Sequence, residues 1–139
     1  MQKNTKCSNM GFFSGLSEDV LQELIKDLER IQFKKGEAII TEQYWGDKLF
    51  FICKGKVEIN KGLHNPETPF AQLSILQAGD FFGELGIIED SPRSASVVAL
   101  EDVELMIIPR VAFHNMIFAY LLIMLNLVRT ISGRLRSTN

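Results

Sequence analysis

A glycine-rich segment flanked by charge is the part of the sequence best suited to chemistry. Glycines stand at positions 79, 83 and 86, with Glu84 among them and Arg93 a short loop beyond. Glycine lets a backbone approach a ligand closely, and free N–H groups at the start of a helical turn bind anions. An arginine fork suits a phosphate, and a carboxylate accepts from hydroxyl groups. The segment therefore fits a ligand with a phosphate and a sugar hydroxyl, although a glycine-rich corner with a surface Arg–Glu pair remains an alternative.

Catalytic chemistry finds little support elsewhere in the chain. The only histidines are His64, in a polar loop, and His114, at the start of an apolar helix. Two histidines cannot supply a three-nitrogen metal site. The sequence holds no Gly-x-Ser-x-Gly elbow, and neither cysteine has a histidine beside it. We therefore expect no enzyme, no metal and no cofactor, with both histidines exposed.

The two cysteines, Cys7 and Cys53, are too few for a disulfide framework. Cys53 follows an apolar run and is expected to be a small buried thiol. The N-terminus lacks the apolar stretch of a signal peptide. These features predict a reducing, cytoplasmic location.

The composition is typical of one globular domain of 139 residues, with 46% apolar residues. The formal net charge is −2 and the sequence pI is near 5.7. This balance argues weakly against a dedicated nucleic-acid binder, which usually has a basic face.

Two changes of apolar period divide the chain into three parts. Helical spacing after Ser17, a suitable N-cap, predicts an amphipathic helix over 18–29. From Ile31 to Pro109, glycine turns separate short strands. These strands are predicted over 36–40, 48–54, 56–60, 70–76, 93–100 and 103–108. Many short antiparallel strands at this spacing favour a β-barrel or jelly roll, similar to the cupins.

From Arg110 the period is helical again, which predicts one long trailing helix. Its apolar residues form a heptad seam: Ile117, Leu121, Met124, Val128, Ile131 and Leu135. The seam predicts a parallel homodimer, with a helix buried on its own barrel as the alternative. Residues 111–128 hold no charged side chain, but the densest apolar part is shorter than the roughly 20 residues of a membrane span. No membrane association is therefore expected.

The glycine-rich segment resembles the phosphate-binding cassette of the cyclic nucleotide-binding domain family. The matching motifs are Phe-Gly-Glu-Leu-Gly followed by two isoleucines (82–88) and Pro-Arg-Ser-Ala-Ser-Val (92–97). Their Gly-Glu-Leu-Gly and Arg-Ser-Ala forms are most similar to bacterial cAMP-receptor transcription factors. The resemblance covers nearly the whole chain and implies a mainly β jelly roll with flanking helices. It implies one domain over 1–139: a helical part (1–30), a barrel with the cassette 82–97 (31–109), and a lid and dimerisation helix (110–139).

The resemblance also implies a role for each site residue, with cAMP, or else cGMP, as the ligand. Arg93 would pair with the cyclic phosphate, and Glu84 would accept from the ribose 2′-hydroxyl. The phosphate would be lined by backbone N–H groups of Gly83, Gly86 and Ser94, with the Ser94 hydroxyl as a further donor. Leu85 belongs to the same motif, and Thr138, late in the trailing helix, would contact the base.

The trailing helix departs from the bacterial relatives because it lacks a proline near its start and contains Gly133. The helix-turn-helix domain that follows it in those proteins is missing from this sequence, so no nucleic-acid-binding element is expected here. The function implied is a sensor that transmits ligand binding through its last helix. The alternatives are a docking module of the same fold that binds no cyclic nucleotide, and a part of a larger transcription factor, channel or kinase regulator.

Overall fold

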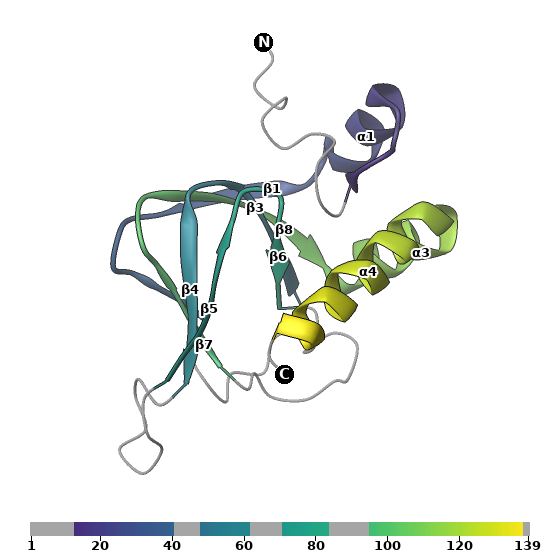
Figure 1. Ribbon diagram of the computed structural model, residues 1–139. Coiled ribbons are helices and arrows are strands. Elements are labelled where there is room, and N and C mark those ends of the chain that lie inside the picture. Colours follow the sequence, from purple (N-terminus) through teal and green to yellow (C-terminus); the bar gives the residue numbers. More distant parts are fainter. Residues whose placement is uncertain (1–12, 41–47, 62–70, 84–94, 138–139) are drawn as a thin grey trace.

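A barrel of two antiparallel sheets, with helices along one side, makes up the computed structural model (Figure 1). The structure describes residues 13–40, 48–61, 71–83 and 95–137. The helices and strands, in chain order, are α1 (Glu18–Ile25), β1 (Glu29–Phe33), β2 (Ala38–Ile40), β3 (Lys48–Lys54), β4 (Lys56–Lys61), β5 (Ala71–Gln77), β6 (Phe81–Phe82), β7 (Ser96–Ala99), β8 (Val103–Pro109), α3 (Arg110–Ala119) and α4 (Leu121–Ser137).

The strands alternate between the two sheets in the manner of a jelly roll. One sheet has the order β1-β8-β3-β6 and the other the order β2-β7-β4-β5. Every strand pair within them is antiparallel. The predicted fold class, a mainly β jelly roll with flanking helices, is therefore confirmed.

The central strands β8 and β3 of the sheet β1-β8-β3-β6 are buried on both faces, which explains the continuous apolar run of β3. Leu49 and Phe51 belong to a cluster with α1, α3 and α4, whereas Ile52 belongs to the cluster between the two sheets. Successive side chains of a strand point to opposite faces, so a strand without polar alternation must have cover on both sides. Each fully buried side chain of this size contributes about 1.5–3 kcal/mol to folding.

The first helix is shorter than the sequence predicts. Ser17 caps it as expected, since its hydroxyl accepts from the Val20 N–H at 3.3 Å. The helix ends at Ile25, however, and β1 begins at Glu29, inside the range predicted as helical. Residues 29–33 pair with residues 103–107 of β8, and this long-range pairing overrides the local helical pattern.

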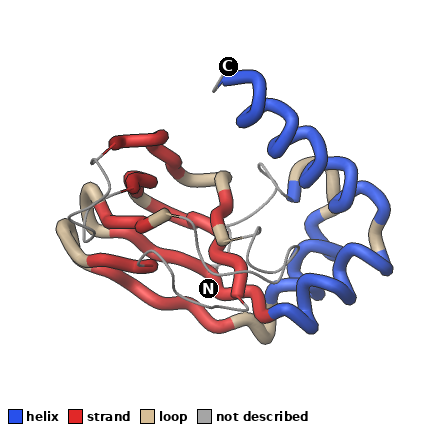
Figure 2. The backbone as a smooth tube through the Cα atoms, turned by 90° about the horizontal axis from the view of Figure 1, so that it is seen from below, coloured by secondary structure: helices blue, strands red, loops and turns tan. Residues whose placement is uncertain are grey.

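The trailing helix is two helices rather than one (Figure 2). Tyr120 between them is extended, with φ −134° and ψ 104°, and the axes of α3 and α4 differ by 112°. The break allows both helices to bury apolar residues in one cluster with the sheet: Phe113 and Met116 from α3, and Ile123 and Leu127 from α4. At 17 residues, α4 is the longest element that the structure describes.

Cys53 corrects a second expectation. It is only 4% exposed, as predicted, but it is disulfide-bonded rather than a free thiol. A buried apolar environment is typical of a structural thiol and of a half-cystine alike, so the local sequence pattern could not separate the two. The disulfide also removes the argument for a reducing compartment that rested on this cysteine.

Candidate functional site

The structure places the entry to the predicted cassette at the end of β6. Gly83 directly follows Phe82 and has φ +92°, a left-handed conformation that favours glycine. The other predicted site residues lie outside the described residues: Glu84, Leu85, Gly86, Arg93, Ser94 and Thr138. Among the predicted site residues, Gly83 is thus the one that the structure describes, and its positive φ is compatible with a tight turn.

Both ends of the cassette are anchored in buried strands, one in each sheet. The strand β6 pairs with β3 through Phe82 and Phe81, whereas Ser96 begins β7 between β2 and β4. Phe82 is 2% exposed and Ser96 is fully buried. The cassette therefore connects the two sheets at fixed points, so its ends are held by the barrel core.

An apolar wall lies on the inner side of this entry. Phe82 stacks on Phe50 with ring centroids 5.2 Å apart, and both belong to the cluster between the sheets. Val97, near the cassette's far end, and Ile59 of β4 belong to the same cluster. These residues fix the strands on both sides of the cassette in the core between the sheets.

The last turn of α4 contacts the strand that leads into the cassette. A guanidinium nitrogen of Arg134 donates to the Phe81 carbonyl oxygen, and the centre of the guanidinium lies 4.7 Å from the centroid of the Phe81 ring. Sequence analysis missed this contact. An arginine in the last turn of a helix is usually explained by the helix dipole, and no local pattern indicates a partner 53 residues away.

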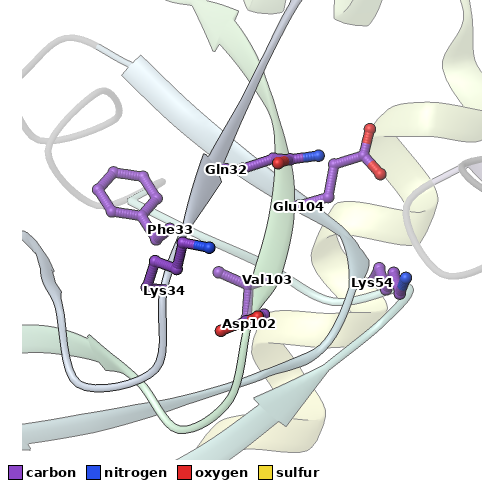
Figure 3. Close-up of a pocket in the computed structure, with 7 residues that line it drawn as sticks. All are labelled: Gln32, Phe33, Lys34, Lys54, Asp102, Val103 and Glu104. Atoms are coloured by element: carbon purple, nitrogen blue, oxygen red, sulfur yellow. The ribbon is translucent and has the colours of Figure 1, made fainter.

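A separate hollow of about 370 Å³ opens where β1 and β3 end and β8 begins (Figure 3). Its charged lining residues are Lys34, Lys54, Asp102 and Glu104. Glu104 forms an ion pair with Arg30 at 3.1 Å, and Asp102 accepts from the Lys35 N–H at 3.1 Å. Both carboxylates therefore have structural partners, and sequence analysis assigned no role to this place.

The structure supplies three further findings on the remaining expectations. His114 lies exposed on α3, as predicted, and His64 lies outside the described residues. Within the described ranges, no group of three or more His, Cys, Asp or Glu residues could hold a metal ion. In the same part of the chain no single helix is long and apolar enough to span a membrane, although α3 and α4 together reach that length across their 112° bend.

Comparison with known proteins agrees with the geometry. The model of the cyclic nucleotide-binding domain family matches residues 30–120. A CRP-like cAMP-activated global transcriptional regulator of Mycobacterium tuberculosis is 33% identical over 129 residues, which are 93% of this chain and 57% of that protein. Human cGMP-dependent protein kinase 2 is 34% identical over 108 residues, which are 77% of this chain and 14% of the kinase.

The fold has a close counterpart among solved structures. The catabolite activator protein of Thermus thermophilus superposes with a TM-score of 0.80 and 27% identity, over 92% of this chain and 59% of that one. This chain thus spans less than two thirds of the length of each of these three proteins. Because the family model covers well over half of the sequence, including both cassette motifs, the chain belongs to the cyclic nucleotide-binding domain family.

Proposed function

We propose that this chain is a ligand-sensing regulatory domain that binds a cyclic mononucleotide and catalyses no reaction. The observation that carries the proposal is the pair of motifs, 82–88 and 92–97, within the matched range 30–120. The turn at Gly83 and the buried strands at both ends of the cassette support it.

The proposed site divides the ligand among a few groups. Arg93 pairs with the cyclic phosphate, while N–H groups of Gly83, Gly86 and Ser94 line it. Glu84 accepts from the ribose 2′-hydroxyl, and Leu85 contributes an apolar contact. The base lies toward Thr138 at the end of the last helix.

Calorimetric titration with cAMP and with cGMP tests the proposal. Saturable binding of either nucleotide at one site per chain is the expected result. Absence of binding to both would instead favour the alternative, a docking module of the same fold that responds to no cyclic nucleotide.

We also propose that cAMP binds more tightly than cGMP. The support is the resemblance of the Gly-Glu-Leu-Gly and Arg-Ser-Ala motifs to the bacterial cAMP receptors. The relatives do not decide the matter, since the cAMP-activated regulator and the cGMP-dependent kinase are 33% and 34% identical to this chain. Equal or tighter binding of cGMP in the same titration would contradict this preference and leave the class of ligand intact.

Transmission is proposed to run through α4, with a second copy of this chain as its partner. Leu121, Val128 and Leu135, at heptad spacing, are 76%, 56% and 64% exposed. Met124 and Leu125 extend this apolar stripe at 41% and 42% exposure. Two residues of the predicted seam, Ile117 and Ile131, pack against the protein's own core instead, so the partner-facing stripe is narrower than the sequence pattern suggested.

The output of the sensor is proposed only as regulation. The relatives include a transcriptional regulator and a protein kinase, and this chain matches the part that these proteins share. Mass spectrometry of the endogenous protein would separate a 15.7 kDa chain from a longer one that carries an output domain.

A further inference from the structure

Arg134 makes two contacts with one residue of the sheet. Its guanidinium donates to the Phe81 carbonyl oxygen and lies over the Phe81 ring, with its centre 4.7 Å from the ring centroid. Phe81 is fully buried and directly precedes the predicted cassette. A single side chain of α4 therefore holds both the backbone and the ring of the residue at the cassette's entrance.

Phe81 lies in a short edge strand, so its contact with Arg134 depends on the position of that strand. The strand β6 has two residues and lies at the edge of its sheet, with β3 as its neighbour. An edge strand has backbone groups that its own sheet does not satisfy. Arg134 satisfies one of them, so a displacement of β6 changes the bond to Arg134.

The position of Arg134 along α4 separates it from the main packing contacts of that helix. The first half of α4 is fixed by the buried residues Ile123 and Leu127, and by Asn126, whose amide donates to the Ser14 carbonyl at 2.9 Å. The last turns are less deeply buried, with Leu135 64% exposed. Gly133 beside Arg134 lowers the intrinsic stability of the same turns.

We propose that Arg134 is a positioning residue that couples the end of α4 to the cassette, so that ligand binding and helix docking stabilise each other. This inference rests on the proposed function, because it assigns a route from that site to the helix. The contacts of Arg134 with Phe81 hold the last turn of α4 beside the cassette entrance. Linkage then requires a bound nucleotide to stabilise the docked end of α4, and the protein with a docked helix to bind nucleotide more tightly.

The test compares Arg134→Gln with Arg136→Gln, a matched control two residues away. Arg136 is exposed and donates to Ser132 of the same helix at 3.0 Å. Calorimetry gives the cAMP affinity, and hydrogen exchange of the peptide covering residues 130–137 reports the docking of α4. Arg134→Lys keeps the cation over the ring, and Phe81→Leu removes the ring but keeps an apolar side chain.

In the parent, cAMP should slow exchange at the end of α4. Arg134→Gln should weaken cAMP binding about 5- to 30-fold, the factor expected for a partly exposed cation–π contact together with a hydrogen bond. Added cAMP at saturation should then no longer slow exchange there. Arg136→Gln should resemble the parent, while Arg134→Lys and Phe81→Leu should lie between the parent and Arg134→Gln.

Two results would overturn the proposal, and they differ from failure of the proposed function. Unchanged affinity and intact ligand protection in Arg134→Gln would contradict the coupling alone. A general loss of stability in Arg134→Gln and Phe81→Leu, with the ligand protection of α4 retained, would assign Arg134 a structural role only. A parent that binds no cyclic nucleotide would contradict the proposed function and this inference together.

Discussion

At the scale of single residues, Arg93 is predicted to matter more than any other side chain of the site. It would meet the negative charge of a cyclic phosphate in a partly desolvated pocket, where truncation of a charge pair costs about 2–5 kcal/mol. Arg93→Leu should therefore weaken cAMP binding roughly 30- to several-thousand-fold. Arg93→Lys should restore only part of the affinity, because an ammonium lacks the bidentate fork.

Glu84→Ala should have a smaller effect than Arg93→Leu. It removes one charge-assisted hydrogen bond to the ribose, for which about 1.5–3 kcal/mol is expected. Calorimetry on both variants ranks the two contributions. A larger loss of affinity in Glu84→Ala than in Arg93→Leu would show that the phosphate is not the main anchor of the ligand.

Two glycines are predicted to respond to alanine in opposite directions. At Gly55, with φ +96°, a Cβ would lie 2.5 Å from Val103 Cγ1 and 2.6 Å from the Asp102 carbonyl oxygen. Gly55→Ala should destabilise the fold by more than the roughly 1–2 kcal/mol of the left-handed backbone alone. At Gly133 a Cβ would meet nothing within 4 Å, so Gly133→Ala should stabilise α4 by about 1 kcal/mol. Urea denaturation gives the change in the free energy of unfolding for each variant. Destabilisation by Gly133→Ala would contradict an open helical position at Gly133.

At the residue scale, the sequence was most informative about local backbone conformation and least informative about contacts between distant residues. The motif has glycine at position 83, and the backbone there has a positive φ that favours glycine. The contact of Arg134 with Phe81 was not predictable, because it joins residues that only the tertiary fold brings together. The disulfide of Cys53 was missed for a related reason, since its local sequence is that of any buried strand.

At the scale of elements, the exposed stripe of α4 is predicted to form a dimer interface. Val128→Glu places a charge in the middle of the stripe and should give a folded monomer in sedimentation experiments. Arg129→Glu changes an exposed neighbour outside the stripe and serves as the control. A parent that stays monomeric at high concentration, with and without cAMP, would contradict the dimer.

The bounds of the predicted elements were accurate where turns separate the strands, and less accurate where the apolar pattern is weak or a break has no turn residue. The strands β3, β4, β5 and β8 were each predicted to within a residue at both ends, whether continuously apolar like β3 or alternating like β4, because turns bound them. The strand β1, Glu-Arg-Ile-Gln-Phe, has too little apolar content to be separated from the end of a helix. The break at Tyr120 has no proline or glycine to mark it, and it lets both helices bury residues in one apolar cluster.

At the scale of the whole molecule, we predict that Cys53 of the folded protein is held in a disulfide bond. A thiol reagent applied in denaturant should label the peptide that contains Cys53 only after reduction. Mass spectrometry of that peptide gives the result directly. Labelling before reduction would contradict the disulfide and restore the expectation of a buried free thiol.

The whole molecule combines a barrel with a last helix, α4, that contacts the strand leading into the cassette. The cassette begins in β6 of one sheet and ends in β7 of the other, while α4 contacts β6 and has an exposed apolar stripe. The proposed transmission through α4 requires ligand binding and dimerisation to strengthen each other by the same factor. Sedimentation at several cAMP concentrations measures this factor, and a dimerisation constant that does not change with cAMP would contradict the linkage.

Calorimetric titration of the parent and of Arg93→Leu with cAMP, side by side, tests the central claim most directly. The parent should show saturable binding at one site per chain. Arg93→Leu, with an unchanged circular dichroism spectrum, should bind at least about 30-fold more weakly. Equal affinity in the two proteins, or no binding by the parent, would contradict the claim that this cassette is a cyclic nucleotide site.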